Sequence, residues 1–375
     1  MILIFFVLCL YTPVVFSRNA IFDWKNPKYA EDVERFVGKK EVLIELTNEI
    51  LGVSPSKTKK SFGNTTEIEE NPYIFEGDII VTEGQLDEMI LDARNQLMEK
   101  KYPNFIREKR AAFVTNSSQL WTMPISYMIE KGVNEKVVFA GIQKWESETC
   151  VRFARRYVAD WDYIWFVNEP GCSSSMGMVG GLQFITLENG QCDRLGQVTH
   201  EIAHALGVYH EQSRPDRDQY VTINTNNILT KRLQRNFEIK SSANYYGSAY
   251  DYNSVMHYMQ YDMAIIKSIP TITTKDPYYQ ETIGQSDGPS FADVKAVNDA
   301  YCKNKCRNYI FCFAGYQDPN NCDQCKCPWP FSGKFCNVTT VASTCGNELT
   351  GTADLQTLTV EGAKTCTIVI RVRYC

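Results

Sequence analysis

Three histidines and one glutamate near the middle of the chain have a spacing that suits metal-dependent chemistry. The stretch H-E-x-x-H-x-x-G-x-x-H contains His200, Glu201, His204, Gly207 and His210. Residues four apart lie on one face of a helix, so two imidazoles can reach one metal ion. A glycine can adopt positive φ, end the helix and bring the third histidine to the same point. Three imidazoles leave one position of a tetrahedral zinc open, where the glutamate can reach a water.

The full motif is far more specific than its first five residues, which also occur by chance in helices. The chain has only four histidines, and three of them lie in this motif. The fourth, His257, belongs to the run Ser-Val-Met-His-Tyr, which has Met256 at its centre. The long motif followed by a methionine turn is the signature of the metzincin class of zinc proteases. We therefore predict one zinc ion, Zn2+, bound by the three motif histidines.

Both motifs resemble those of one metzincin family, the astacins, which are secreted zinc endopeptidases. The third histidine is followed by Glu211, and Tyr258 lies two places after the methionine, as in that family. The flanking runs 214–218 and 250–252 are also similar, and the likeness extends over residues 111–302. The resemblance implies an α+β fold of the metzincin type, with a helical zinc-binding motif and a mixed sheet.

The resemblance also implies a role for each residue around the zinc. Glu201 would act as general base and pass its proton to the leaving amine, and Tyr258 would stabilise the developing oxyanion. Only its position distinguishes Tyr258, one of 21 tyrosines, from a packing residue. Met256 would form the Met-turn beneath the histidines, which coincides with plain core packing. Glu211 would pair with the amino terminus created by activation, although a solvated surface carboxylate is the simpler interpretation.

The elements that must position these residues are predicted from periodicity and from turn residues. A long helix is expected over 134–157, where apolar residues recur at helical spacing. Strands are expected at 124–129, 163–168 and 181–187. The Ser- and Gly-rich run 171–181 is expected to be a loop. By resemblance, 181–183 would be the edge strand to which a substrate backbone adds.

The first 17 residues have the composition of a signal peptide. Residues 2–16 are almost wholly apolar, and Val15-Phe16-Ser17 provides a cleavage site. This run is shorter than the roughly 20 residues that a membrane-spanning helix needs, and no later apolar run approaches that length. The chain also has 14 cysteines, which favour an oxidising compartment. These features predict a secreted, extracellular protein without a membrane span.

Residues 18–110 are charged and free of cysteine, and they have two interpretations. They could form a small helical domain, because 85–101 carries apolar residues at helical spacing. They could instead be a pro-segment, because they end in Arg-Glu-Lys-Arg, which resembles a site cut by furin-type proteases. We favour the pro-segment, with cleavage after Arg110 and a new amino terminus at Ala111. Trp121, which lies where the astacin family has an early tryptophan, supports this start.

A tetrapeptide inside this segment, Phe75-Glu76-Gly77-Asp78, resembles the F-x-G-D motif of astacin pro-segments. The resemblance implies that Asp78 occupies the open position of the zinc and excludes water, so that the precursor is latent. The simpler alternative is a turn, since Gly-Asp is a common turn pair. The location of the motif ahead of a processing site favours the zinc-directed role.

The cysteines predict two disulfide regions. Four lie in the protease-like part, where the residues alone leave three pairings open, and the resemblance implies Cys150–Cys302 and Cys172–Cys192. Residues 303–336 resemble an EGF-like module, usually paired first to third, second to fourth and fifth to sixth. Its cysteines are Cys306, Cys312, Cys322, Cys325, Cys327 and Cys336. A zinc knuckle is the competing interpretation, but no histidine is nearby.

Residues 337–375 resemble the opening of a CUB domain, a sandwich that needs roughly 100 residues. Cys345 and Cys366 fit this resemblance, and we expect the partial domain to be poorly ordered. Without Cys9 of the signal peptide, thirteen cysteines remain, and this odd number leaves Cys375 unpaired or intermolecular. Three Asn-x-Ser/Thr sequons predict glycosylated surface loops. They are Asn64, Asn116 and Asn337.

The formal net charge of −5 gives no indication of nucleic-acid binding. We predict a secreted endopeptidase that acts on proteins or peptides and is made as a latent precursor, processed by a furin-type protease. The EGF-like and tail modules are candidates for extracellular matrix contacts. Two alternatives stay open. One is a catalytically idle binding or matrix protein, against which the intact Glu201 argues, and the other is a decoy or inhibitor, which no residue favours.

Overall fold

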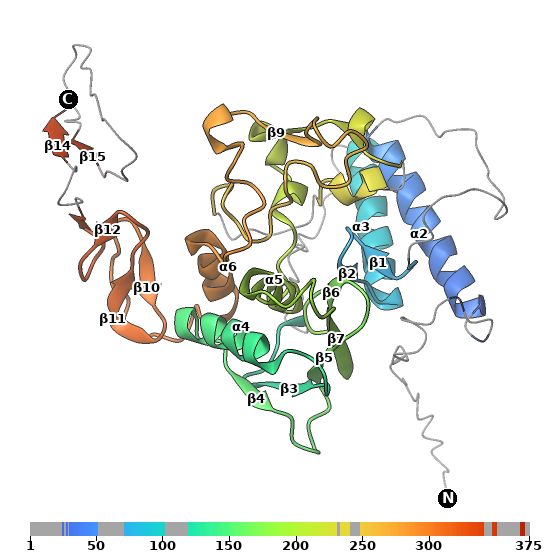
Figure 1. The fold of residues 1–375 in the computed structure, drawn as a ribbon, viewed down its shortest axis with the longest axis horizontal. Helices are drawn as coiled ribbons and strands as arrows, with labels where there is room; N and C mark the ends of the chain where they lie inside the picture. Colours follow the sequence, from blue (N-terminus) through green and yellow to red (C-terminus); the bar gives the residue numbers. More distant parts are fainter. Residues whose placement is uncertain are drawn as a thin grey trace, which may run out of the picture. The chain divides into compact units, whose positions relative to one another are not determined.

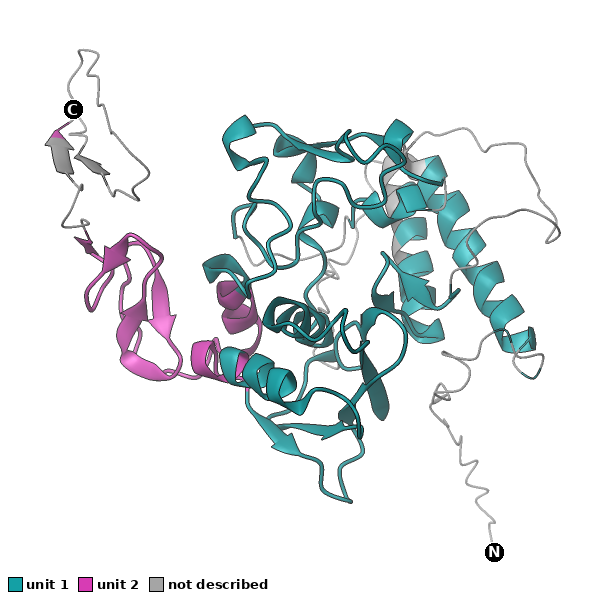
Figure 2. Cartoon of the chain, viewed as in Figure 1, with its two compact units in different colours: residues 1–144, 152–293 teal, residues 145–151, 294–375 magenta. Residues whose placement is uncertain are grey.

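The computed structural model divides into two compact units, which Figure 2 shows in different colours. The first comprises residues 1–144 and 152–293, and the second comprises residues 145–151 and 294–375. The residues that the structure describes are 30–51, 71–101, 119–230, 233–240, 248–340, 347–350 and 368–371, with Lys25 and Lys28. Among them, no helix combines the length and the apolar character that a membrane crossing needs.

Several predicted features lie outside the described residues. They are the signal peptide 1–17, the sequons at Asn64 and Asn116, the cleavage site at Arg110 and Ala111, and the tail cysteines Cys345, Cys366 and Cys375. Asn337, the asparagine of the third sequon, lies within the described residues and is exposed, as a glycosylation acceptor must be.

A seven-stranded mixed sheet organises the first unit, in the order β1-β2-β6-β7-β5-β3-β4. Five strands come from the protease-like part: β3 (Ile125–Ile129), β4 (Phe153–Arg155), β5 (Tyr163–Val167), β6 (Cys172–Ser175) and β7 (Leu182–Leu187). β3, β4, β5 and β7 are parallel, whereas β6 is antiparallel to β7. Ile164 and Phe166, two positions apart on β5, are fully buried, as expected for one face of a strand.

Two short strands from the predicted pro-segment extend this sheet. β1 (Ile74–Phe75) and β2 (Ile79–Ile80) form an antiparallel hairpin, and β2 pairs in parallel with β6. The N–H of Ser174 also donates to the Asp78 carbonyl oxygen at 2.9 Å. The hairpin therefore takes the edge of the protease-like sheet by adding strands to it.

Two sequence-based expectations about this edge were wrong. The run 171–181, expected as a loop, contains β6. Among the strands of the protease-like part, the edge is β6 rather than 181–183, because β7 pairs with both β5 and β6 whereas β6 pairs only with β7. Serine and glycine have low strand propensity, but ladder bonds to β7 and β2 on either side of β6 outweigh it. A disulfide between Cys172 and Cys192 further ties this strand to the chain that follows β7.

Two long helices, α2 (Ala30–Leu51) and α3 (Glu83–Lys101), lie side by side near the hairpin (Figure 1). The predicted helix 85–101 is most of α3, and its Leu86 and Ile90 are buried. Glu83 forms ion pairs with Arg35 at 3.1 Å and with Lys39 at 2.8 Å. These pairs are partly solvated, so apolar packing contributes more to the helix pair than they do.

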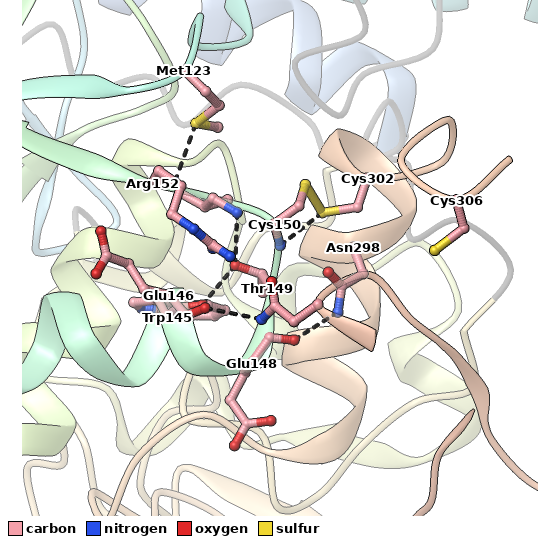
Figure 3. The surroundings of a disulfide bond; sticks show 12 residues. Met123, Trp145, Glu146, Glu148, Thr149, Cys150, Arg152, Asn298, Cys302 and Cys306 are labelled. Carbon is pink, nitrogen blue, oxygen red and sulfur yellow. Dashed lines mark hydrogen bonds between the residues drawn. A yellow bond between two sulfur atoms is a disulfide. The ribbon is translucent and has the colours of Figure 1, made fainter. Parts of the chain in front are cut away.

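The helix α4 (Glu135–Glu148) is shorter than the predicted 134–157. The Thr149 hydroxyl donates to the Trp145 carbonyl at 2.6 Å and accepts from the Val151 N–H at 3.1 Å. This side chain thus replaces the next helical bond, and a disulfide between Cys150 and Cys302 fixes the turn (Figure 3). The chain leaves the helix here and continues as β4.

The remaining elements of the first unit lie in or after the histidine motif in the chain. The helix α5 (Leu195–Ala205) carries its first half, and β8 (Val221–Ile223) pairs with β9 (Ile272–Thr274) beyond it. Short 3₁₀ turns fill the intervening chain: Glu211–Ser213, Arg217–Gln219, Thr225–Asn227, Leu233–Phe237 and Pro277–Tyr279. Their core includes Phe237, Tyr250 and Ile272, so irregular backbone is held here by an apolar cluster.

Disulfides dominate the second unit. α6 (Phe291–Tyr301) leads into the hairpins β10 (Tyr316–Asp318) with β11 (Asn321–Lys326), and β12 (Phe331–Ser332) with β13 (Val338–Thr339). The three bonds Cys306–Cys322, Cys312–Cys325 and Cys327–Cys336 have the pairing that the EGF-like resemblance implies. In the tail, β14 (Asn347–Thr350) and β15 (Ile368–Arg371) form a parallel pair.

Candidate metal centre and active site

The end of α5 decides where the third histidine can lie. Gly207 has φ +96°, and its N–H donates to the His204 carbonyl at 2.8 Å. The N–H of Val208 donates to the Ala203 carbonyl at 2.9 Å. These two bonds form a Schellman motif, which closes a helix with a residue in left-handed conformation. The chain therefore turns back after Gly207, and His210 approaches the two helical histidines, as the sequence predicted.

Each of the three imidazoles has its Nδ1 atom held by an acceptor. His200 Nδ1 lies 2.8 Å from the Val255 carbonyl, and His204 Nδ1 lies 2.8 Å from the Val208 carbonyl. His210 Nδ1 instead lies 2.9 Å from a carboxylate oxygen of Glu76. When Nδ1 carries the proton and donates it to such an acceptor, the lone pair that can bind a metal is on Nε2. These contacts therefore fix both the ring orientation and the metal-binding tautomer.

The three Nε2 atoms converge on the Asp78 carboxylate. The distances are 3.3 Å from His200, 3.1 Å from His210 and 3.6 Å from His204. All four possible ligand atoms lie within 4.8 Å of one another. Ligands of a tetrahedral zinc, about 2.0 to 2.1 Å from the ion, lie about 3.4 Å apart. The sequence-predicted histidines and Asp78 are thus brought together at a spacing that fits zinc.

Polar atoms around this point also fit a cation. His204 Nε2 and one oxygen each of Asp78 and Glu201 are buried, and none of them has a hydrogen-bond partner among the described residues. Burial acts to lower the pKa of His210, but the charges of Asp78 and Glu76 outweigh it and raise the pKa to about 10. The protein atoms therefore favour positive charge here, and a divalent metal would supply it.

Glu201 lies where the motif predicts, on α5 between the two helical histidines. Its side chain is buried, with only 2% of the residue exposed. Burial first, and then the negative charge of Asp78, raise the pKa of Glu201 well above its ordinary value. A carboxyl group with a raised pKa close to a metal-bound water is suited to accept and return a proton.

Tyr258 lies against the third histidine, with ring centroids 4.7 Å apart. Its hydroxyl donates a short hydrogen bond to the backbone carbonyl of Glu76. The fourth histidine, His257, points away: its Nε2 accepts from the Tyr250 hydroxyl at 2.7 Å, and its Nδ1 donates to the Tyr258 carbonyl at 2.8 Å. Burial lowers the pKa of His257 to about 4, so it is a neutral packing residue.

Comparison with known proteins decides the family. The model of the peptidase family Astacin matches residues 113–302, which include all three histidines and the methionine turn. The chain belongs to the astacin family. This family model ends at Cys302, the predicted limit of the protease domain, and covers neither the EGF-like region nor the hairpin that carries Asp78.

Several curated relatives are zinc metalloproteinases of nematodes. The zinc metalloproteinase nas-34 of Caenorhabditis elegans is 40% identical over 390 residues, which cover 97% of this chain and 64% of that protein. The zinc metalloproteinase nas-30 of the same species is 39% identical, over 78% of this chain and 39% of that protein. This astacin chain therefore spans less than two thirds of the length of either relative.

A similar solved structure is high choriolytic enzyme 1, a hatching enzyme zinc-protease from the medaka fish Oryzias latipes. It is 34% identical, with a TM-score of 0.47, and the match covers 50% of this chain and 96% of that one.

The astacin Met-turn depends on an acidic residue that the sequence analysis missed. Met256 is fully buried, and the Asp293 carboxylate accepts from the Ser254 hydroxyl at 2.6 Å and from the Val255 N–H at 2.9 Å. The Val255 carbonyl in turn holds His200, so Asp293 positions a zinc ligand through the turn. Its signal was present: Ser290 and Asp293 bond reciprocally as a capping box, the pattern S-x-x-D before an apolar helix.

The structure describes only some of the residues that the resemblance to astacins assigns to activation. Glu211 is buried, with its carboxylate 2.7 Å from the Asp251 N–H and 3.3 Å from Arg214. Burial, more than any nearby charge, raises the pKa of Glu211 to about 8. It is therefore not the solvated surface acid of the simpler interpretation. Trp121 is also buried, and its indole N–H donates to the Ala205 carbonyl at the end of α5.

Proposed function

We propose that this chain is a secreted zinc-dependent endopeptidase that is made as a latent precursor. The observation that carries the proposal is the convergence of three histidine Nε2 atoms and the Asp78 carboxylate on one point, beside the buried Glu201. A binding or matrix protein has no need of a buried general base at a metal site. The names of the curated relatives, zinc metalloproteinases, support the same activity.

Asp78 would keep the precursor inactive. Burial acts to raise the pKa of Asp78, but the positive charge on His210 and the close contacts with the histidine rings hold the pKa well below its ordinary value. The ionised carboxylate would take the fourth position on the metal and exclude the water that attacks the peptide. Asp78 lies in a hairpin at the sheet edge, where a substrate strand would otherwise add.

Catalysis would use the residues left after the pro-segment is removed. When bound, zinc lowers the pKa of a water and polarises the scissile carbonyl. Glu201 would take the proton from that water and pass it to the leaving amine. Tyr258, whose hydroxyl now bonds to Glu76, would be free to donate to the oxyanion.

Activation would begin with cleavage after Arg110 by a furin-type protease. The new amino group at Ala111 would then approach Glu211, which burial holds close to neutral near pH 7. An ammonium group beside this carboxylate would lower its pKa and form a buried ion pair. The pair would order the start of the mature protease next to His210, and so couple cleavage to the zinc site.

An extracellular location suits the other parts of the chain. The apolar residues 2–16 would direct export, and five disulfides join cysteines of the described part. Asn64, Asn116 and Asn337 would carry glycans. The EGF-like residues 303–336 and the CUB-like tail would contact extracellular matrix, and the substrates would be extracellular proteins.

The decisive test is hydrolysis of a mixed peptide library by material cleaved after Arg110, with and without a zinc chelator. We expect chelator-sensitive cleavage that returns when zinc is restored, and the products would reveal side-chain preferences. A cleaved chain that contains one zinc and hydrolyses nothing would favour a binding or matrix function instead.

A further inference from the structure

The hairpin that carries Asp78 contains a second carboxylate, Glu76, which is buried and only 1% exposed. One of its oxygens lies 2.9 Å from His210 Nδ1 and 3.2 Å from the Ser213 hydroxyl. The other lies 3.0 Å from the Lys240 ammonium, as an ion pair rather than an aligned hydrogen bond. All three partners belong to the protease domain, so Glu76 is bound by the part of the chain that it would block.

The backbone at Glu76 is also held by the protease domain. The residue has φ +51°, a left-handed conformation that is unfavourable for a residue with a Cβ atom. Its carbonyl accepts the hydrogen bond from Tyr258, and Gly77, with φ +90°, continues the turn. These contacts define a turn that places Asp78 two residues beyond the anchored Glu76.

Lys240 provides a complementary surface for this turn. Its side chain is 11% exposed, and its ammonium lies 4.3 Å from the centroid of the Phe75 ring as well as near Glu76. Its own N–H donates to the Ser213 carbonyl at 2.7 Å, which fixes it beside the third histidine. A nearly buried lysine requires a carboxylate partner, and in this structure the partner comes from the pro-segment.

We infer that Glu76 is a second anchor of latency: its ion pair with Lys240 seats the hairpin so that Asp78 reaches the three histidines. Glu76 is a positioning residue, because it acts through Asp78 and through the ring of His210. This inference rests on the proposed latency and adds the contact that makes the blocking carboxylate effective. Glu83, whose pairs with Arg35 and Lys39 are partly solvated, provides the matched comparison within the same segment.

The test uses the full chain with Arg110→Ala, which prevents cleavage at the proposed site. Six precursors are compared for hydrolysis of a fluorogenic peptide library per bound zinc: the parent, Asp78→Ala, Glu76→Gln, Lys240→Met, the double variant Glu76→Gln/Lys240→Met, and Glu83→Gln. We expect Glu76→Gln and Lys240→Met each to raise activity about 10-fold or more, because truncating one partner of a buried pair weakens the contact strongly. The double variant should exceed neither single variant by much, since both remove the same interaction.

A second series keeps Arg110, so that cleavage removes the pro-segment. Glu76→Gln and Glu83→Gln then yield the same mature chain as the parent, and both must give parental activity. This result separates a change in latency from a folding defect.

The outcomes distinguish the inference from the proposal beneath it. If Asp78→Ala is active but Glu76→Gln and Lys240→Met are as latent as the parent, the second anchor is refuted and Asp78 alone maintains latency. If Glu83→Gln activates as much as Glu76→Gln, general loosening of the segment explains the effect, and the inference is again overturned. A latent Asp78→Ala precursor would refute the proposed latency itself, and the anchor with it.

Discussion

The two sides of the metal centre are built differently. On the histidine side, backbone carbonyls of Val208 and Val255 orient two of the rings, within a helix cap and a turn fixed by Asp293. On the blocking side, the hairpin 71–81 reaches the same point through side chains and through strands of only two residues. One side is integral to the fold, and the other is added to it by two short strands, by polar contacts and by Ile74 and Ile80, which pack with Val167 and Phe184.

Under the proposed latency, this difference would explain how a site can be complete and inactive at once. Backbone contacts inside α5 and the Met-turn persist whatever occupies the fourth metal position. The contacts of the hairpin join a segment that precedes Arg110 to the rest of the chain, so a single cut after Arg110 would make all of them contacts between two separate chains. Variants on the histidine side should therefore lower the activity of the cleaved protease, whereas variants of the hairpin should change only the precursor, by weakening its latency.

The largest effect is expected from Glu201→Ala in the cleaved protease. Loss of the general base should lower kcat/KM by at least about 10³-fold, because no other described carboxylate lies between the helical histidines. Zinc content, measured by elemental analysis, should stay at one ion per chain, since Glu201 is not a ligand. Turnover close to that of the parent would refute the assigned role.

A variant of Tyr258 should give the next largest effect. This residue contacts both His210 on the histidine side and Glu76 on the blocking side. Tyr258→Phe removes only the hydroxyl, which bonds to Glu76 in this structure. In the cleaved protease we expect kcat to fall about 10²-fold with little change in KM, as for loss of one oxyanion donor. Steady-state kinetics on a single peptide would measure this, and an unchanged kcat would leave Tyr258 as a packing residue.

Asp293→Asn should weaken zinc binding indirectly, through the Met-turn that positions His200. The Asp293 carboxylate accepts bonds from Ser254, Val255 and Ser290, and an amide would turn an N–H toward one of these donors. We expect roughly 10-fold weaker zinc binding, measured by chelator competition. Asp299→Asn, the same change at a partly exposed position of α6, is the control. Equal effects of both variants would contradict a specific role in the Met-turn.

The smallest effect concerns the pH dependence of stability. The pKa of Glu211 is raised from 4.5 to about 8 in the folded chain, so the folded state binds its proton more tightly than the unfolded state. Its stabilising contribution is therefore complete below about pH 4.5 and is lost as the pH rises toward 8. The Tm of the uncleaved chain should fall by a few degrees over this window, and less so in Glu211→Gln. Cleavage after Arg110 should also flatten the profile, if the new ammonium group ionises Glu211.

Local patterns were sufficient to predict much of the site. The three histidines, Gly207 and the Met-turn are specified by near neighbours in the chain, because helix spacing and a Schellman cap are local geometry. The helix 85–101 was predicted on the same basis. The predicted helix 134–157 was too long because one threonine hydroxyl, Thr149, ends it where the apolar pattern continues.

Sequence alone thus determined the metal, its three ligands, the likeness to astacins and the candidate blocking carboxylate, because each is encoded by residue types at fixed short spacing. Only the tertiary structure decided that β6 forms the edge taken by the hairpin, that Asp293 supports the Met-turn, and that Glu76 meets Lys240 beside His210. Glu76 and His210 are 134 positions apart. No local pattern links such residues, because their contact depends on how strands and loops pack after the chain has folded.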